Sequence, residues 1–341
     1  MQKEFHYVRL NIMSWKTSTL LVILSFFNQY RTCPYWIAPS LKYTVLNVSM
    51  RQNVVSNVIK VLDNFDAMTI VIDKQYLPQL CCDIMNLDHR FQEIIFRAGS
   101  IRDIEATCFS RSVQNVTERI DFSFNALTSI KSGTFKDLEI AELWLSGNFI
   151  KTLEYGAFFN LTKLRVLSLE KNNLQMLNSE AFSSLSSLQS LDLGHNNIRN
   201  LQRGALNFLA RDATVSLNCN KIIQIGSFLE GTSLKIKLNL GLNGNKIESF
   251  SGDIVENRTF EILNLANNPL KNISAVLSSA KIERLEFSCG YLSVEDVQSV
   301  VIWAEARRIL LFSNGCSQHN ISFGLTSSTI SCSSTRIALN I

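Results

Sequence analysis

The residue types best suited to catalysis meet near the middle of the chain. Asp192 and His195 fall on one predicted strand and its exit, and Ser168 and Ser216 fall on the neighbouring strands. A Ser–His–Asp set acts as a hydrogen-bonded chain beside an oxyanion hole, which stabilises the charge that develops in the transition state. An open sheet supplies no such hole and does not exclude water. A hydrolase is therefore a remote alternative, and the chain is not predicted to be an enzyme.

Metal and cofactor chemistry is not indicated. The eight cysteines include no CxxC pair, and the four histidines show no zinc-ligand spacing. Zinc sites are built from three or four such ligands, several of them closely spaced in the sequence. We therefore expect neither a metal site nor a cofactor.

The charge of the chain argues against a further class of function. The 341 residues carry a net charge of only +4, and no long run of basic residues occurs. Proteins that bind nucleic acid generally carry a basic patch or stripe. With 46% hydrophobic and 18% charged residues, the chain can bury a core. We expect no nucleic-acid partner.

A surface that binds a partner has a better physical basis. Trp144 lies between two leucines that are two residues apart, so its side chain is predicted to point away from the core. Arg119, Asp121 and Glu142 fall on the same predicted surface, and interfaces concentrate Trp and Arg where most of the binding energy lies. The alternative is that Trp144 packs over neighbouring strands and binds no partner. The candidate ligand-binding residues are Trp144, Arg119, Asp121, Glu142, Glu170, Asp192 and His195.

Three tandem copies of one phrase must position these side chains. In the first copy Leu143 and Leu145 are followed by Asn148. Later apolar positions, Phe158 among them, are predicted to return to the interior. The phrase recurs twice, each time 24 residues further on. Self-similarity at such a period is typical of a solenoid, in which each coil contacts only its neighbours.

Each part of the phrase has a physical role. Leucines at alternate positions fill one face of a short strand, because side chains alternate across a strand. The asparagine stands where the chain leaves the strand, and its amide can donate and accept hydrogen bonds together. It can therefore pair with buried backbone groups that would be costly to leave unpaired. The asparagines predicted to form this structural ladder are Asn125, Asn148, Asn172, Asn196, Asn220, Asn245 and Asn268.

The predicted fold class is an α/β solenoid. We expect a horseshoe with parallel strands on its concave face and irregular loops and short helices on its convex face. About eleven coils are expected, with atypical coils at the ends because these must face water. The expected boundaries are a signal-peptide region at 1–32, an N-terminal cap at 33–66, the repeats at 67–315 and a C-terminal cap or tail at 316–341.

The last coils depart from the phrase. Ser293 and Asp296 form a capping box ahead of a helical pattern, which predicts a helix near residues 294–306 on the convex side. The strand that follows is expected to place Leu310 and Phe312 in the interior and Leu311 outward.

Outward side chains on neighbouring strands are expected to form ladders across the sheet. One ladder takes the residue between the two leucines of each strand. Its second half turns small and polar, so that half is not expected to anchor a ligand. Its members are Val71, Ile95, Asp121, Trp144, Ser168, Asp192, Ser216, Gly241, Asn264, Glu286 and Leu311.

The N-terminal pattern is typical of a secretion signal. Basic residues precede an apolar run at 20–27, which is too short to span a bilayer. The cleavage site stays open, and Met13 is an alternative start. We expect a secreted, extracellular chain without a transmembrane span, and the alternative is a chain anchored to the membrane by the uncleaved segment. The glycosylation candidates are Asn47, Asn115, Asn160, Asn257, Asn272 and Asn320.

Seven of the eight cysteines cluster at the two ends of the repeats. In an oxidising compartment such clusters indicate disulfide bonds that fasten the caps. The N-terminal four allow two bridges, with the first and last cysteines each joined to one of the adjacent pair. The C-terminal three allow one bridge, either Cys316–Cys332 or Cys289–Cys316. The disulfide candidates are Cys33, Cys81, Cys82, Cys108, Cys289, Cys316 and Cys332.

Cys219 stands apart from both clusters. It occupies the same slot as Cys289 three coils away, which corresponds to about 14 Å at the spacing of neighbouring strands and exceeds disulfide reach. We therefore predict that Cys219 is buried and unpaired, as a small apolar filler. The alternative is a thiol that links two chains in a disulfide-bonded dimer.

The phrase Leu-x-Leu-x-x-Asn resembles the leucine-rich repeat, and its Phe-containing second half resembles the typical extracellular subfamily. The resemblance covers about residues 68–315. The pattern is similar to invertebrate Toll-type ectodomains, chaoptin-type adhesion proteins and insect secreted leucine-rich immune proteins. No heptads follow Cys316, so the coiled coil of the last group is not expected. The membrane span and signalling domain of a Toll-type receptor are not expected either.

The resemblance implies a secreted recognition module. It would bind a protein ligand, a partner subunit or a microbial surface through its concave face, in innate immunity. The alternative is a cell-surface adhesion protein or receptor ectodomain in development or neural wiring. A purely structural matrix role is the third interpretation.

Overall fold

The computed structural model describes residues 91–105, 109, 116–177, 179–223, 225, 228–249, 257–273 and 281–314. Nearer the N-terminus it describes the backbone of six strands, β1 to β6. The chain divides into two compact units, which are described separately. The first unit comprises Met1–Leu169 and Glu180–Leu188, and the second comprises Glu170–Ser179 and Gln189–Ile341.

The first unit is built on a sheet of short strands. From β4 onward each strand pairs in parallel with the next, whereas β3 and β4 are antiparallel. The order is β3 (Trp36–Pro39), β4 (Thr44–Leu46), β5 (Met68–Asp73), β7 (Phe91–Arg97), β9 (Val116–Asp121), β11 (Glu142–Trp144) and β13 (Val166–Ser168). Two further strands, β1 (Asn11–Trp15) and β2 (Thr19–Ile23), form a separate antiparallel pair.

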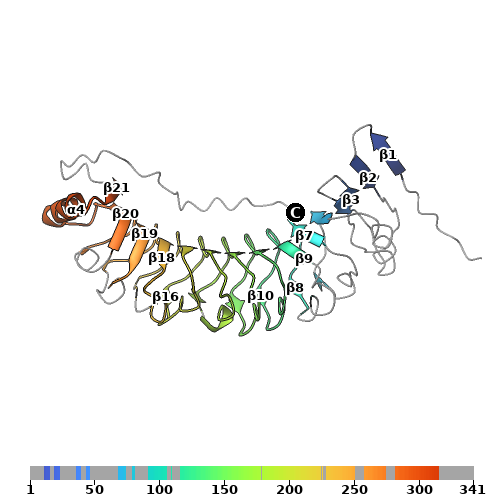
Figure 1. Cartoon of the computed structure of the whole chain (residues 1–341), viewed down its shortest axis with the longest axis horizontal. Helices are drawn as coiled ribbons and strands as arrows, with labels where there is room; N and C mark the ends of the chain where they lie inside the picture. The colour runs from blue at the N-terminus through green and yellow to red at the C-terminus, as the bar shows by residue number, and fades with distance from the viewer. Residues whose placement is uncertain are drawn as a thin grey trace, which may run out of the picture. The chain divides into compact units, whose positions relative to one another are not determined.

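Short parallel pairs close the return half of the coils in the first unit. They are β6 (Gln79–Leu80) with β8 (Asp103–Ile104), and β10 (Ser129–Ile130) with β12 (Thr152–Leu153). In Figure 1, β7 and β9 lie on the upper side of these coils and β8 and β10 on the lower side. Each coil therefore passes from a strand of the main sheet to a short strand and back.

The second unit repeats this plan. Its main strands are all parallel, in the order β15 (Ser190–Asp192), β17 (Ala213–Ser216), β18 (Lys237–Gly241), β19 (Thr259–Asn264), β20 (Lys281–Ser288) and β21 (Leu310–Asn314). On the return half, β14 (Met176–Leu177) pairs with β16 (Asn200–Leu201). One 3-10 turn, η3 (Ser179–Ala181), and one helix, α4 (Val294–Arg307), complete the described elements.

The predicted parallel-strand solenoid is confirmed, with about eight turns. The larger count of about eleven coils stays a prediction, as do the horseshoe curvature and the convex position of the helices. Among the described residues, no helix is long and apolar enough to cross a membrane.

The interior of the coils is apolar and close-packed. Leu143 and Leu145 on β11 and its exit are fully buried, as the alternation of side chains predicts. In the first unit, phenylalanines from successive coils also stack, with ring centroids 5.0 Å apart for Phe96 and Phe122. Such pairs contribute about 0.5–1.5 kcal/mol each beyond the area that they bury. Stacking between coils therefore supplies stability that no single coil could reach.

Buried asparagines bond the coils to one another. In the first unit, Asn148 Oδ1 accepts the Leu127 N–H at 3.1 Å, and its Nδ2 donates to the carbonyls of Phe122 and Leu145 at 2.9 and 3.0 Å. In the second unit, Asn220 makes the equivalent three contacts at 3.0, 2.9 and 3.0 Å. All seven asparagines of the predicted ladder are buried. Asn148 and Asn220 thus each satisfy backbone groups of their own coil and of the coil before it.

The residue ahead of each asparagine turns the chain out of its strand. It has a positive φ in seven coils, at Phe124, Gly147, Lys171, His195, Cys219, Gly244 and Asn267. Glycine is required at only some of these positions. At Gly147 an added Cβ would lie 2.6 Å from the Phe124 ring, so the aromatic ring occupies the space that a side chain would need. His195 and Cys219 therefore stand at strand exits, outside the regular alternation.

The helix predicted near residues 294–306 is confirmed as α4. The Ser293 side chain caps it by accepting the Asp296 N–H at 3.0 Å, and acidic residues occupy its first turn. Arg308 ends it in the left-handed conformation, with φ 56°.

The predicted register of the last strand is wrong by one residue. Leu311 pairs with Leu285, and Phe312 pairs with Glu286 on the outward ladder, where Leu311 was expected. Leu310 is mostly exposed and Ser313 takes the interior position. The Arg308 turn sets the point at which the strand begins, and a shift of one residue moves every side chain to the other face. The hydrophobic pattern alone does not contain this information.

The prediction that Cys219 is buried and unpaired is also wrong. Cys219 is half-buried, and both it and Cys289 are disulfide-bonded. The spacing of neighbouring strands bears only on a bridge between these two cysteines. The left-handed turn at Cys219 brings this residue toward the surface, away from the interior position that was expected. The other disulfide candidates, Cys33, Cys81, Cys82, Cys108, Cys316 and Cys332, lie outside the described residues.

Candidate binding surface on the strands

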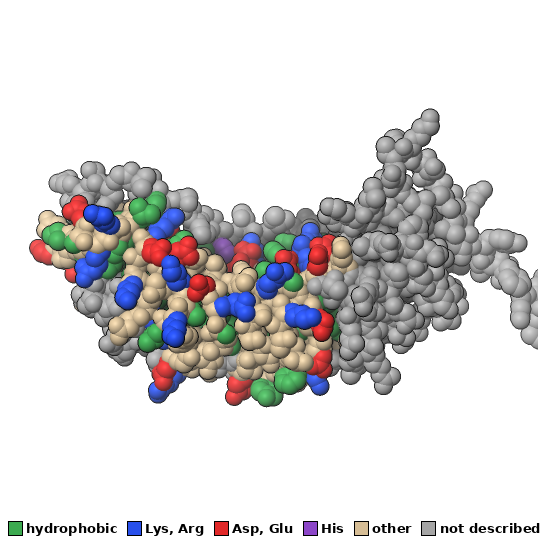
Figure 2. Space-filling model, viewed as in Figure 1, with side chains coloured by type: hydrophobic (Ala, Val, Ile, Leu, Met, Phe, Trp, Pro, Cys, Tyr) green, Lys and Arg blue, Asp and Glu red, His purple; other side chains and the backbone are tan. Residues whose placement is uncertain are grey.

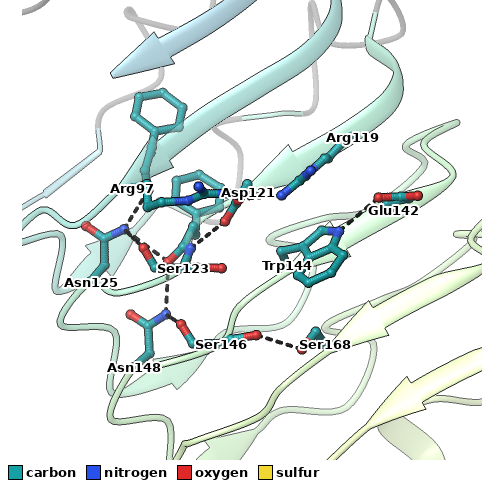
Figure 3. A network of polar contacts seen from close by, with 12 residues as sticks. Arg97, Arg119, Asp121, Ser123, Asn125, Glu142, Trp144, Ser146, Asn148 and Ser168 are labelled. Atoms are coloured by element: carbon teal, nitrogen blue, oxygen red, sulfur yellow. Dashed lines mark hydrogen bonds and ion pairs between the residues drawn. The ribbon is translucent and has the colours of Figure 1, made fainter. Parts of the chain in front are cut away.

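The predicted tryptophan stands at the centre of a polar cluster in the first unit. Asp121 on β9 lies opposite Trp144 on β11, and Arg119 lies opposite Glu142. The Arg119 guanidinium stacks over the Trp144 ring, 4.8 Å from its centroid, and the indole Nε1 donates to Glu142 Oε2 at 3.0 Å. We call these four residues, together with Arg97, the Trp144 cluster. Figure 3 shows the Arg119 and Glu142 side chains on the same side of the indole.

Asp121 is the buried residue of this cluster and contacts both of its arginines. Its side chain is 0% exposed and accepts the Ser123 N–H at 2.8 Å. Its other oxygen receives Arg119 Nη2 at 2.8 Å and also Arg97 Nη2. Burial alone would raise the pKa of Asp121, but hydrogen bonds from Ser123 and Arg97 and the charge of Arg97 outweigh it, so the pKa lies below its ordinary value. The carboxylate is thus saturated with donors and positions the arginines.

The side chains of the cluster other than Asp121 are partly exposed, so a partner can contact them. The Arg97 side chain is 44% exposed and that of Arg119 is 23% exposed, while Trp144 and Glu142 are half-buried. Arg97 was missed by the sequence reasoning. It lies two residues beyond Ile95 on the outward side of β7, so the alternation of the strand could have identified it.

Ser168 is engaged within the first unit. Its hydroxyl shares a 2.6 Å hydrogen bond with that of Ser146 on the neighbouring coil, and both residues are buried. This pair closes the sheet face beside Trp144 (Figure 3).

The other candidate residues gather around Asp192 in the second unit. Asp192 Oδ1 accepts the Gly194 N–H at 2.9 Å. Burial raises the pKa of Asp192, the charge of Glu170 raises it further, and the contacts with Gly194, Ser216 and His195 only partly offset this. Asp192 is half-buried, and Lys171 forms an ion pair with Glu170 at 2.7 Å. Around Asp192 the carboxylates thus outnumber the basic side chains. In the Trp144 cluster, Arg97 and Arg119 balance the charge of the carboxylates.

The hydrolytic set does not assemble from the predicted residues. His195 occupies the left-handed slot, and its backbone N–H donates to the Asn218 carbonyl at 2.8 Å. Ser216 accepts from Asn218 Nδ2 at 3.2 Å, and within the described part of the chain no hydrogen bond joins the His195 ring to a serine hydroxyl.

Further along the second unit, polar side chains bond back to the backbone or to each other. Asn264 Oδ1 accepts the Ala266 N–H at 3.0 Å, and its Nδ2 donates to Glu286 Oε2 at 2.6 Å. Asn218 Oδ1 accepts the Asn243 N–H at 2.9 Å, which leaves no room for a side chain at Gly241. This stretch offers few polar groups that are not already bonded.

The charges on the visible face show no field of one sign. Lys and Arg alternate with Asp and Glu over the described coils in Figure 2. Mixed charges of this kind do not attract a polyanion strongly. Three glycosylation candidates, Asn160, Asn257 and Asn272, are exposed, and Asn47, Asn115 and Asn320 lie outside the described residues.

A comparison with protein-family models finds repeats in part of the coils described above. A family model described as "Leucine rich repeat" matches residues 115–174 and 139–198. No curated protein matches the chain. Among solved structures, a crystal structure of a TLR13–ssRNA13 complex is similar, with 20% sequence identity and a TM-score of 0.47 over 74% of this chain. The chain covers 44% of that protein. Residues 115–198 therefore carry leucine-rich repeats within the parallel coils described above.

Proposed function

We propose that this protein is a secreted recognition module that binds a protein ligand through the Trp144 cluster. The observation that carries the proposal is the arrangement of Trp144 and Arg119, which are stacked, partly exposed and fixed from below by a buried carboxylate. Trp and Arg are the residues most often found at the energetic centre of interfaces. Because their side chains are already held in place, little conformational entropy remains to be lost on binding.

The proposed compartment is extracellular. Cys219 and Cys289 are disulfide-bonded, and stable disulfides are typical of oxidising compartments. The exposed asparagines of three sequons favour the same compartment. Secretion would follow from the N-terminal signal predicted at 1–32.

The biological setting that we favour is innate immunity. The support is the resemblance of the repeats to secreted immune proteins and Toll-type ectodomains, which is an analogy at the level of the fold. Induction of the protein in blood cells by microbial challenge is expected. Constant expression in neurons or muscle would favour the adhesion role instead.

The proposed site is tested by truncating the indole. The full chain is immobilised, and proteins that it retains from extracellular fluid are identified. The affinity of the retained protein is then measured for the unaltered chain, for Trp144→Ala and for Phe159→Ala. Trp144→Ala should weaken binding about 30-fold or more, the effect of losing a contact worth about 2 kcal/mol.

Phe159→Ala provides the matched control. Phe159 is exposed and lies beneath Lys136, whose Nζ is 5.6 Å from the ring centroid, but it belongs to a turn after β12. This variant should bind within about twofold of the unaltered chain if the site is local. Equal affinity of Trp144→Ala and the unaltered chain would exclude the Trp144 cluster as the binding site.

A further inference from the structure

A second constellation of the same design lies in the second unit. Arg284 and Glu286 stand two residues apart on β20, and Phe312 on β21 lies opposite Glu286. The Arg284 guanidinium stacks over the Phe312 ring at 4.0 Å from its centroid and pairs with Glu286 Oε1 at 2.6 Å. We call these three residues the Phe312 cluster.

The correspondence with the Trp144 cluster covers its Arg119, its buried acid and its aromatic residue, whereas Arg97 and Glu142 have no counterpart in the Phe312 cluster. In both, an arginine precedes an acid by two residues on one strand, and an aromatic residue lies opposite that acid on the next strand. The acids, Asp121 and Glu286, are both buried. The arginine Nε is shielded from solvent and lacks a hydrogen-bond partner in both clusters, at Arg119 and Arg284. The arginine side chains nevertheless keep 23% and 34% of their surface exposed.

The charges of each cluster are compensated internally. Arg284 is paired with Glu286, and the two arginines of the Trp144 cluster face Asp121 and Glu142. A ligand group that carries a net charge would therefore find no uncompensated charge to bind. The group that fits is uncharged.

In the Phe312 cluster, the hydrogen-bonding capacity that remains is that of a donor. Glu286 already accepts from Arg284 on one oxygen and from Asn264 on the other, at 2.6 Å each. Asp121 is saturated in the same way. Sugar hydroxyl groups would need acceptors, whereas a carbonyl oxygen needs the donors of a guanidinium. The aromatic ring beside that guanidinium suits an apolar side chain.

We propose that the Phe312 cluster is a second binding site with the same specificity as the Trp144 cluster. Each takes an apolar side chain together with a neighbouring backbone carbonyl of a protein segment. The proposal rests on the proposed function and extends it to the half of the outward ladder that was not expected to anchor a ligand.

The test uses the full chain and a small neutral probe, N-acetyl-leucine methylamide, which combines an apolar side chain with two carbonyl groups. The Nε–H signals of Arg119 and Arg284 are followed by NMR during titration and are assigned by their loss in Arg119→Lys and Arg284→Lys. Both signals should shift, with dissociation constants in the millimolar range and within about threefold of each other. Phe312→Ala should abolish the shift at Arg284 and leave that at Arg119, and Trp144→Ala should do the reverse.

The outcomes separate the two proposals. If Arg119 responds and Arg284 does not, the Phe312 cluster is not a second binding site, and the proposed function stands. If only Arg284 responds, the Trp144 cluster is wrong as the ligand site, and the shared specificity proposed for the two clusters is wrong with it. If neither responds, both are wrong. Stronger shifts with maltose or inorganic phosphate than with the amide would overturn the proposed specificity. Phe159→Ala serves as the control and should leave both signals unchanged.

Discussion

Asp121 on β9 and Asp192 on β15 occupy the same slot of the repeat, in the first and the second unit. Each accepts the backbone N–H two residues further on, from Ser123 at 2.8 Å and from Gly194 at 2.9 Å. Yet the pKa of Asp121 is lowered and that of Asp192 is raised. The repeat thus fixes the backbone contact, and the neighbouring side chains decide whether the carboxylate is stabilised.

The difference between the two pKa values comes from the hydrogen bonds that each buried carboxylate accepts and from the neighbouring charges. Arg97 and Arg119 converge on Asp121, whereas Asp192 has Glu170 beside it and Ser190 where Arg119 stands in the other strand. Folding therefore stabilises the ionised form of Asp121 and destabilises the ionised form of Asp192. This contrast explains why a preorganised cluster is found at Trp144 and not around Asp192.

The largest expected effect is a contrast in the free energy of unfolding between two substitutions at equivalent positions of the repeat. Asp121→Asn keeps the oxygen that accepts the Ser123 N–H but removes the charge that faces two arginines, so it should lower the free energy of unfolding by about 2 kcal/mol at pH 7. Asp192→Asn removes a desolvated charge beside Glu170, so it should leave stability unchanged or raise it by up to about 1 kcal/mol. Urea unfolding and amide hydrogen exchange at Ser123 and Gly194 measure both effects. Equal losses in the two variants would refute the contrast.

The pH dependence of stability should also differ in sign. The folded-state pKa of Asp121 lies below 3.8, so its contribution is present above pH 3.8 and is lost as the pH falls toward the folded value. The folded-state pKa of Asp192 lies above 3.8, so its protonated form favours folding, and this contribution is lost as the pH rises from 3.8 through the folded value.

Urea midpoints between about pH 3 and pH 6 separate the two contributions. Relative to the unaltered chain, Asp121→Asn should reduce the loss of stability on acidification. Asp192→Asn should reduce the loss as the pH rises. Curves that change in the same direction for both variants would show that the neighbouring charges do not act as described.

The smallest expected effect comes from transferring one arginine. Ser190 precedes Asp192 by two residues, as Arg119 precedes Asp121. Ser190→Arg should lower the pKa of Asp192 and stabilise the chain by about 0.5–1 kcal/mol at pH 7, because the new ion pair is partly exposed. NMR titration of the Asp192 carboxyl carbon measures the pKa, and Ser190→Gln controls for side-chain length. An unchanged pKa in the arginine variant would mean that burial alone sets it.

The repeated phrase contains enough information to predict the coils. The 24-residue spacing of Asn148 and its equivalents predicts parallel strands, because the apolar pattern and the asparagine both depend on local chain geometry. The outward position of Trp144 follows from the alternation within one strand. These features need no knowledge of distant contacts.

The features that were missed depend on contacts outside the phrase. The register at Phe312 is set by the turn at Arg308 after α4, which the hydrophobic pattern does not show. Phe312 was therefore expected in the interior, and its cluster with Arg284 was not recognised. Asp121 was expected to face a ligand, but it is buried and forms an ion pair with Arg97 from another strand. The disulfide bond of Cys219 cannot be derived from the position of Cys219 in the repeated phrase.

Side-chain oxidation of the full chain, with and without its retained protein ligand, tests the central claim most directly. The reactivity of Trp144 and Phe312 on the strands is compared with that of Tyr155 and Phe159 on a turn, which are 65% and 45% exposed. The account predicts that the ligand lowers the oxidation rates of Trp144 and Phe312 and leaves those of Tyr155 and Phe159 unchanged. Protection of Tyr155 and Phe159 with unchanged reactivity at Trp144 would contradict it.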